Sequence, residues 1–276
     1  MAPRAARKPW GRRDLPSPFG RWADGTESIG EIIFDPPDGS DPELLVKFLF
    51  TAEKLSIQVH PDDCAALDEG ARRGKDEAWI VLAADPNATI GIGLTREVSD
   101  QALRQAVADG SIEQLVDWRP VFAGDCFYSP AGTIHAIGAG LSLVEIQQNC
   151  DVTYRLYDYG RARELHVDEA IAVSRRAPAG PAQEGFDIAP ARTRLAGGPA
   201  FQVERLKGPM RSRLSPPNKG LWLVLLEGAA YVDDRPLNPG EVWWVDQACS
   251  LRLAADADLI LAYPGGELGS FISPTA

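Results

Sequence analysis

The chain has 276 residues, of which 45% are hydrophobic, and it carries a net charge of −11 with a pI near 4.8. This length and apolar content fit one large packed domain or two modest ones. The negative charge disfavours nucleic acids and anionic membranes as partners, because both attract basic surfaces, but a small anionic substrate needs only a few local Lys or Arg residues.

The N-terminal ten residues are basic, but no long apolar run follows them, so we do not expect a secretory signal. No stretch reaches the roughly 20 apolar residues that a membrane helix needs. The four cysteines, at positions 64, 126, 150 and 249, form no Cys-x-x-Cys pair, which argues against a disulfide framework or a thiolate zinc site. We therefore expect a cytoplasmic protein.

Short apolar runs separated by Gly, Pro and Asp dominate the first half and predict strands at residues 28–34, 44–51, 55–60, 78–83 and 89–94. The apolar spacing then becomes helical, which predicts a helix over residues 99–107 and a second short helix over 111–118. Strands resume at residues 126–129, 134–137, 141–147 and 153–157, and a helix follows at 167–174.

Residues 177–191 are rich in Pro, Ala and Gly and are predicted to be a linker. After them, strand-like runs lie at residues 201–206, 221–226, 229–233, 241–245, 250–253 and 259–263. We therefore predict one domain over residues 1–176, with a short helical insertion near 99–118, and a smaller all-β domain over residues 192–276 that contains no His.

The first two of the three histidines stand in patterns that suggest a metal site. Gln58 and His60 lie two residues apart on a predicted strand, so both side chains point to one face. Glu77 opens the next strand, and His135 follows a Pro-x-Gly turn that would direct its imidazole inward. A single His or Glu is usually structural, but these four together could bind one divalent cation.

Two sets of motifs carry a resemblance to known families. The spacing Gly124-x5-Pro130-x-Gly132-x2-His135 resembles the second cupin motif, although Ala139 stands where that motif usually closes with Asn. The segments Ser56-Ile57-Gln58-Val59-His60, Lys75-Asp76-Glu77, and residues 130–136 and 145–158 together resemble type I mannose-6-phosphate isomerase in its short bacterial form. Lys75-Asp76-Glu77 departs slightly from that family's more usual Lys-Thr-Glu.

The resemblance implies a mainly β fold: a cupin-type β-barrel, or jelly roll, with a few short helices, followed by a smaller degenerate cupin-like domain without metal ligands. It implies an isomerase that interconverts mannose 6-phosphate and fructose 6-phosphate through a cis-enediol. The implied metal ligands, most often of Zn²⁺, are Gln58, His60, Glu77 and His135. The implied catalytic residues are Arg155, Lys75, Glu145 and Asp151, and the implied phosphate-binding residues are Ser56, Lys47 and Arg155.

The residues themselves agree with such chemistry. Isomerisation moves a proton between C1 and C2, so it needs a base that can return its proton and a positive group for the developing oxyanion. An Arg155 that faced a barrel interior would be strongly disfavoured without an anion. Lys75, Glu145 and Asp151 all remain candidates for the base, and these ligands would also suit Mn²⁺, Fe²⁺, Co²⁺ or Ni²⁺.

Two other functions stay open from the sequence. An iron-dependent cupin oxygenase would use two His and one carboxylate, and Gln58 argues against that ligand set. A sugar-phosphate-binding protein without catalytic activity would keep the ligands as structure, but it would have no need of an inward-facing Glu145.

Overall fold

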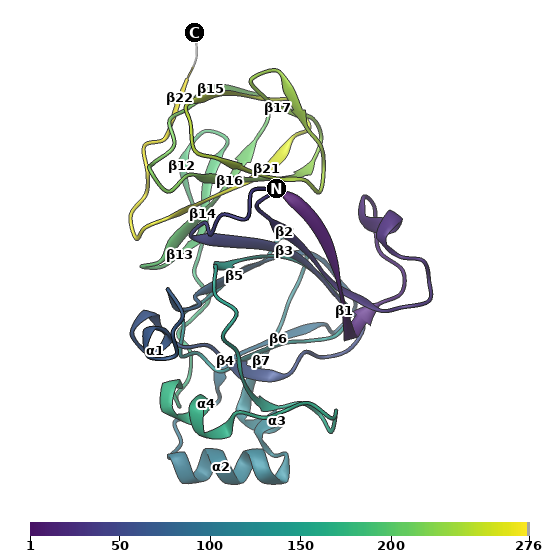
Figure 1. Ribbon diagram of the computed structural model, residues 1–276, viewed down its shortest axis with the longest axis vertical. Coiled ribbons are helices and arrows are strands. Elements are labelled where there is room, and N and C mark those ends of the chain that lie inside the picture. The colour runs from purple at the N-terminus through teal and green to yellow at the C-terminus, as the bar shows by residue number, and fades with distance from the viewer. Residues whose placement is uncertain (275–276) are drawn as a thin grey trace.

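The computed structural model describes residues 1–274 and contains two β-barrels stacked one on the other (Figure 1). Each barrel consists of a six-stranded sheet and a five-stranded sheet. Helices α2, α3 and α4 lie at the end of the first barrel that is remote from the second. The predicted class is confirmed: the fold is mainly β, with a few short helices. No helix within residues 1–274 is both long and apolar enough to cross a membrane.

The first barrel has antiparallel sheets in the strand orders β1-β2-β3-β10-β5-β8 and β11-β4-β9-β6-β7. Its strands are β1 (Ala2–Arg12), β2 (Ile29–Asp35), β3 (Leu44–Thr51), β4 (Ile57–Val59), β5 (Glu77–Ala84), β6 (Thr89–Leu94), β7 (Val116–Pro120), β8 (Cys126–Ser129), β9 (His135–Ile137), β10 (Leu141–Gln148) and β11 (Tyr154–Tyr157). Its helical segments are the 3-10 turn η1 (Phe19–Trp22), α1 (Asp63–Asp68), α2 (Asp100–Asp109), α3 (Ile112–Leu115) and α4 (Val167–Val173).

The second barrel repeats this arrangement with the orders β12-β13-β14-β21-β16-β19 and β18-β17-β20-β15-β22. Its strands are β12 (Phe186–Ala189), β13 (Arg192–Gly197), β14 (Phe201–Lys207), β15 (Met210–Leu214), β16 (Leu221–Glu227), β17 (Ala230–Val232), β18 (Arg235–Leu237), β19 (Val242–Val245), β20 (Cys249–Leu253), β21 (Asp258–Pro264) and β22 (Ile272–Pro274).

Alternation along the strands explains how the two barrels join. In β3, Lys47 and Leu49 point into the first barrel, whereas Val46, Phe48 and Phe50 point out of it. The outward residues pack against the outward face of the second barrel's six-stranded sheet, including Trp222 and Ile260, in one buried core. The sheets therefore stack back to back, which leaves the interior of each barrel free to carry different side chains.

Three segments differ from the sequence-based expectations. The expected helix over residues 111–118 ends at Leu115, and Val116–Pro120 forms strand β7, because Ile90 and Gly91 in β6 pair with it. The expected linker is partly structured, since Phe186–Ala189 form β12 and pair with β13. The N-terminal segment, from which only the absence of a signal was inferred, forms the long strand β1 along the edge of the first barrel.

Phe48 should test the back-to-back core, because its ring is 1% exposed and lies 4.5 Å from that of Phe19, centroid to centroid. We expect Phe48→Ala to lower the free energy of unfolding by about 3–5 kcal/mol, the usual cost of deleting a buried ring. Chemical denaturation measures this loss. Phe122, which is 69% exposed, provides the control, and equal losses for Phe48→Ala and Phe122→Ala would contradict this description of the core.

Candidate metal centre and substrate cleft

The four predicted metal ligands come together inside the first barrel. Gln58 lies on β4, directly opposite His135 at the start of β9, and His60 is the first residue after β4. Glu77, the first residue of β5, reaches them from the opposite sheet. His60, Glu77 and His135 are all buried and offer nitrogen and oxygen atoms that lie within 4.8 Å of one another.

The distances within this cluster suit a tetrahedral cation. His60 Nε2 lies 3.2 Å from Glu77 Oε1, and His135 Nε2 lies 3.3 Å from Glu77 Oε2. The Gln58 side-chain nitrogen lies 3.5 and 3.3 Å from the same two imidazole nitrogens, so a half-turn of the carboxamide presents its oxygen there instead. Ligands about 2.1 Å from a tetrahedral centre are separated by roughly 3.4 Å.

The hydrogen bonds of the two imidazoles direct their free nitrogens at one point. His60 Nδ1 donates to the carbonyl oxygen of Val152 at 2.9 Å, and His135 Nδ1 donates to that of Thr133 at 2.9 Å. Each Nε2 therefore presents a lone pair to the Glu77 carboxylate. Glu77 Oε1 is buried, and within residues 1–274 no donor forms a well-directed hydrogen bond to it, although the Lys75 ammonium lies 3.1 Å away. These residues fit a divalent cation, which would satisfy all of these lone pairs at once.

The charges nearby keep the ligands in the state that a metal requires. Burial, together with the positive charge of Lys75, lowers the pKa of His60 to about 4, and burial also lowers the pKa of His135. Burial alone would raise the pKa of Glu77, but His60 and Lys75 outweigh it and hold that pKa well below its ordinary value. At neutral pH the cluster therefore contains two neutral imidazoles and one carboxylate.

A cleft of about 460 Å³ opens beside the cluster, between the inner face of β1, β2 and β3 and the strands β4 and β11. All of the residues predicted for catalysis or phosphate binding line it, as do two metal ligands, Gln58 and Glu77. His60 and His135 lie beneath its surface, at 1% and 2% exposure. Sequence analysis missed four further charged residues on its walls, which are Arg4, Lys8, Glu31 and Arg163.

Two buried ion pairs form the floor of the cleft. Lys47 Nζ lies 3.2 Å from Glu145 Oε1, and the indole nitrogen of Trp79 donates to Glu145 Oε2 at 3.1 Å. Lys75 Nζ lies 3.1 Å from Glu77 Oε1. Burial raises the pKa of the Glu145 carboxyl even though Lys47 opposes that shift. Burial would lower the pKa of Lys47, but Glu145 and other carboxylates reverse this, so its ammonium stays charged.

Arg155 differs from the other cations of the cleft. Its Nη1 donates to the carbonyl oxygen of Glu164 at 2.8 Å, and its buried Nε has no hydrogen-bond partner among the described residues. Arg163, also on the cleft wall, is held by the buried carboxylate of Asp158 at 2.6 and 2.7 Å. Burial lowers the pKa of Arg155, and the charge of Arg163 adds to that shift, although the carboxylates of Asp158 and Glu164 oppose it.

The other predicted residues have separate positions in the cleft. The Ser56 hydroxyl lies 3.1 Å from the outer atom of the Gln58 carboxamide. After the half-turn that presents the Gln58 oxygen to the imidazoles, this outer atom is the amide nitrogen, which would donate to the Ser56 hydroxyl. Asp151 is exposed at the rim. On β1, Lys8 points into the cleft and pairs with Glu31 at 3.2 Å. Alternate residues of β1, namely Arg4, Ala6, Lys8 and Trp10, line this cleft, but polar and apolar residues stand on both faces of the strand, so its sequence does not reveal which face is buried.

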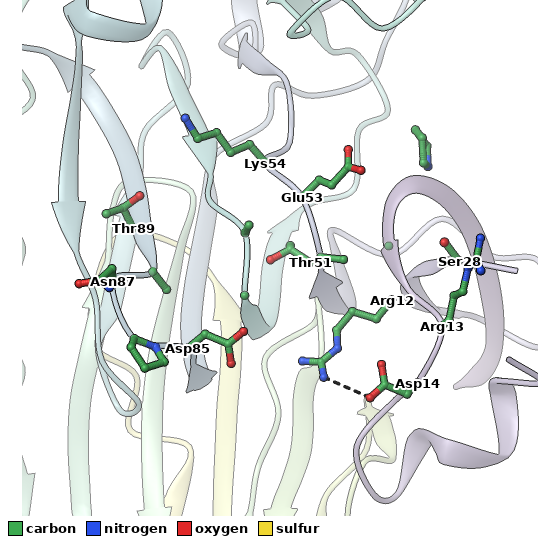
Figure 2. Close-up of a pocket in the computed structure, with 17 residues that line it drawn as sticks. Arg12, Arg13, Asp14, Ser28, Thr51, Glu53, Lys54, Asp85, Asn87 and Thr89 are labelled. Carbon is green, nitrogen blue, oxygen red and sulfur yellow. Dashed lines mark ion pairs between the residues drawn. The ribbon is translucent and has the colours of Figure 1, made fainter.

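A larger cavity, of about 830 Å³, lies on another part of the first barrel (Figure 2). Arg12 and Asp14 form an ion pair of 3.5 Å in it, and Thr51, Asp85 and Asn87 line its other side. Its three cations, Arg12, Arg13 and Lys54, are balanced by Asp14, Glu53 and Asp85. It contains none of the cluster residues, so the chemistry belongs to the smaller cleft.

Comparisons with known proteins agree with the predicted resemblance. The chain is 45% identical to mannose-6-phosphate isomerase of Streptococcus mutans over 136 residues, which cover 47% of this chain and 43% of that protein. It is 38% identical to a mannose-6-phosphate isomerase of Bacillus subtilis over 148 residues, or 51% and 47% of the two chains. These sequence matches therefore cover about half the length of each curated relative. No protein-family model matches the chain.

The solved structures cover far more of the molecule. The crystal structure of a mannose 6-phosphate isomerase from Bacillus subtilis superposes with a TM-score of 0.83 at 26% identity, covering 95% of this chain and 98% of that one. The chain resembles the mannose-6-phosphate isomerases, in sequence over about half its length and in fold over nearly all of it. A phosphomannose isomerase variant from Salmonella typhimurium shares the fold, with a TM-score of 0.72, 14% identity, and coverage of 96% and 98%.

The two cluster histidines should make the metal-free protein sensitive to acid. Because their folded pKa values lie below the ordinary 6.5, the unfolded chain binds more protons between about pH 6.5 and pH 4. The stability that they contribute is complete above about pH 6.5 and is lost as the pH falls towards 4. For His60 alone we expect a loss of about 2 kcal/mol between roughly pH 7.5 and pH 5.

Urea unfolding of chelator-treated protein at the two pH values measures this loss. His60→Gln should show a smaller loss than the wild type. His166→Gln, which removes the remaining histidine of the chain and leaves the cluster intact, should match the wild type. Identical pH dependence in all three proteins would contradict a buried neutral His60.

Proposed function

We propose that this protein is a metal-dependent aldose–ketose isomerase that interconverts mannose 6-phosphate and fructose 6-phosphate through a cis-enediol. The observation that carries the proposal is the position of the ligand cluster, which adjoins a cleft containing a buried carboxylate, Glu145, and an arginine without an anionic partner, Arg155. The names of the relatives and the full-length structural match support the same activity.

The proposed metal is Zn²⁺, held by His60, His135, Glu77 and the side-chain oxygen of Gln58. When bound, such an ion would polarise the sugar carbonyl and stabilise the negative charge that develops on its oxygen. Two imidazole nitrogens and two oxygens form a ligand set that suits zinc. A two-histidine, one-carboxylate iron site would instead leave open the position that Gln58 occupies.

In this proposal the residues of the chain hold the substrate and move the proton. Arg155 binds the phosphate, with Arg163 beside it, because guanidinium groups match phosphate oxygens and the buried Arg155 Nε has no hydrogen-bond partner within residues 1–274. Lys47 and Ser56 line the same cleft and hold Glu145 and Gln58, respectively. Burial keeps bulk water from the cleft floor, where the enediol would otherwise exchange or decompose.

Of the three candidate bases, Glu145 fits best. It is 5% exposed on the cleft floor, and its raised pKa brings the carboxyl closer to the operating pH, where a group can both accept and return a proton. Lys75 is engaged with the metal ligand Glu77, and Asp151 is exposed at the rim. Lys47 would stabilise the ionised form of Glu145 after the proton leaves.

The four free cysteines support the expected reducing, cytoplasmic location.

Arg155→Ala should test the phosphate site. A charge-assisted hydrogen bond contributes about 1.5–3 kcal/mol, so we expect kcat/KM for mannose 6-phosphate to fall roughly 10- to 100-fold. A coupled isomerase assay on zinc-loaded protein, repeated after chelation, measures both this loss and the metal requirement. Arg211→Ala, an exposed change in the second barrel, is the control. A folded, zinc-replete wild type without turnover would reject the proposed function.

Glu145→Gln should test the base. The amide keeps the size of the carboxyl but cannot take a proton, so we expect kcat to fall by about 100-fold or more while KM changes little. Exchange of the substrate C2 proton with solvent deuterium should slow in parallel. Asp151→Asn is the comparison, and a larger loss there than in Glu145→Gln would transfer the role to Asp151.

A further inference from the structure

Asp76 stands between the cleft residue Lys75 and the metal ligand Glu77, and it is itself buried, at 7% exposure. Both of its carboxylate oxygens have donors. The Tyr128 hydroxyl donates to Oδ2 at 2.6 Å, and the backbone amide of Ala131 donates to Oδ1 at 2.8 Å. Its own backbone amide donates to Gln148 Oε1 at 2.9 Å. Hydrogen bonds therefore hold both carboxylate oxygens and the backbone amide of Asp76.

Its partner Ala131 lies in the turn that leads to His135. The Thr133 amide donates to the carbonyl oxygen of Pro130 at 3.1 Å and closes this turn, and Thr133 also accepts the hydrogen bond that orients the His135 ring. The Gly132 amide donates to the carbonyl oxygen of His60 at 2.8 Å. The Asp76 carboxylate thus connects the strand that begins with Glu77 to a turn in contact with both metal-binding histidines.

Its other partner, Tyr128, reaches the second barrel. The Tyr128 ring centroid lies 5.1 Å from that of Phe201, the first residue of β14. The backbone of Gly198 packs on the same ring so closely that an added Cβ would lie 2.4 Å from it. Gly198 and Phe201 are joined by a hydrogen bond of 3.0 Å in the turn between β13 and β14. This turn therefore holds the tyrosine from the side opposite the metal centre.

We propose that the second barrel fixes the geometry of the metal centre through Tyr128 and Asp76, which act as positioning residues. The inference rests on the proposed function, because it concerns the same metal site. Ligand atoms must stay within about 0.5 Å of their productive positions, and loss of an outer hydrogen bond to a metal site typically weakens metal binding 10- to 100-fold. The second barrel would then support the metal site of the first barrel by restricting the position of Tyr128 on β8.

Tyr128→Phe is the main test. It keeps the ring that packs on Gly198 and Phe201 and removes only the hydroxyl, which leaves Asp76 Oδ2 without a donor. We expect the affinity for Zn²⁺, measured by competition with a chromophoric chelator in the absence of sugar, to fall about 10-fold. Asp76→Asn should have a similar effect, because its amide group can accept only one of the two hydrogen bonds.

Tyr263→Phe is the matched control. The Tyr263 hydroxyl also donates to a buried carboxylate, that of Glu204, but it does so inside the second barrel. This variant should lower the melting temperature while its Zn²⁺ affinity stays within twofold of the wild type. A fall in Zn²⁺ affinity for Tyr263→Phe as large as that for Tyr128→Phe would overturn the proposal, since general destabilisation would then explain both.

Gly198→Ala tests the contribution of the second barrel directly. The added methyl group must displace the Tyr128 ring, so Zn²⁺ affinity should fall although no residue of the first barrel has changed. Wild-type affinity in folded samples of both Tyr128→Phe and Gly198→Ala would overturn the proposal, as would a wild-type protein that binds no Zn²⁺. A wild type that binds Zn²⁺ without isomerase turnover would reject the proposed function and leave this inference standing.

Discussion

The structure of the first barrel depends on one electrostatic constraint: two neutral imidazoles and a carboxylate face each other in a buried space. His60 Nε2 and His135 Nε2 present lone pairs to Glu77 at 3.2 and 3.3 Å, which is repulsive unless a cation lies between them. The backbone carbonyl groups that bind the two Nδ1 atoms prevent the rings from turning away. Because the ligands come from both sheets, this constraint also requires the barrel to close correctly.

The second barrel has the same fold without that constraint, and its interior side chains differ accordingly. In the first barrel, Lys47, Glu145 and Trp79 lie side by side on β3, β10 and β5, whereas Glu204, Leu261 and Leu223 lie side by side on the matching strands β14, β21 and β16. Leu221 opens β16 as Glu77 opens β5. Glu204, the one buried acid of this row, forms an ion pair with Arg192 and accepts a hydrogen bond from the Tyr263 hydroxyl. Leucines thus fill the interior, and its polar groups satisfy one another.

Sequence patterns predicted the parts of the chain in which apolar residues dominate. The strands β3, β6 and β10 are rich in apolar residues, although Lys47 and Glu145 interrupt two of them, and their limits agree with the prediction to within one residue. Strand β1 was missed because Arg4, Lys8 and Pro9 interrupt it, although its polar side chains face a cleft rather than solvent. Motif spacing predicted the four candidate metal ligands, and the structure brings them together. The position of Arg163 in the cleft could not be predicted, because no local sequence feature indicates that Asp158 binds its guanidinium group.

The open edge of the barrel explains why so many charges remain buried around the cleft. Strands β1 and β11 are both sheet edges, and they do not pair with each other, so polar side chains on their inner faces meet across a gap. The ion pairs Lys47–Glu145 and Lys75–Glu77 lie at the bottom of this gap, where desolvation offsets most of their mutual attraction. Apolar side chains can occupy such interior positions, as leucines do in the second barrel, and replacing a buried ion pair by apolar groups is often neutral or stabilising. The charged residues of the first barrel are therefore better explained by what enters the cleft than by the stability of the fold.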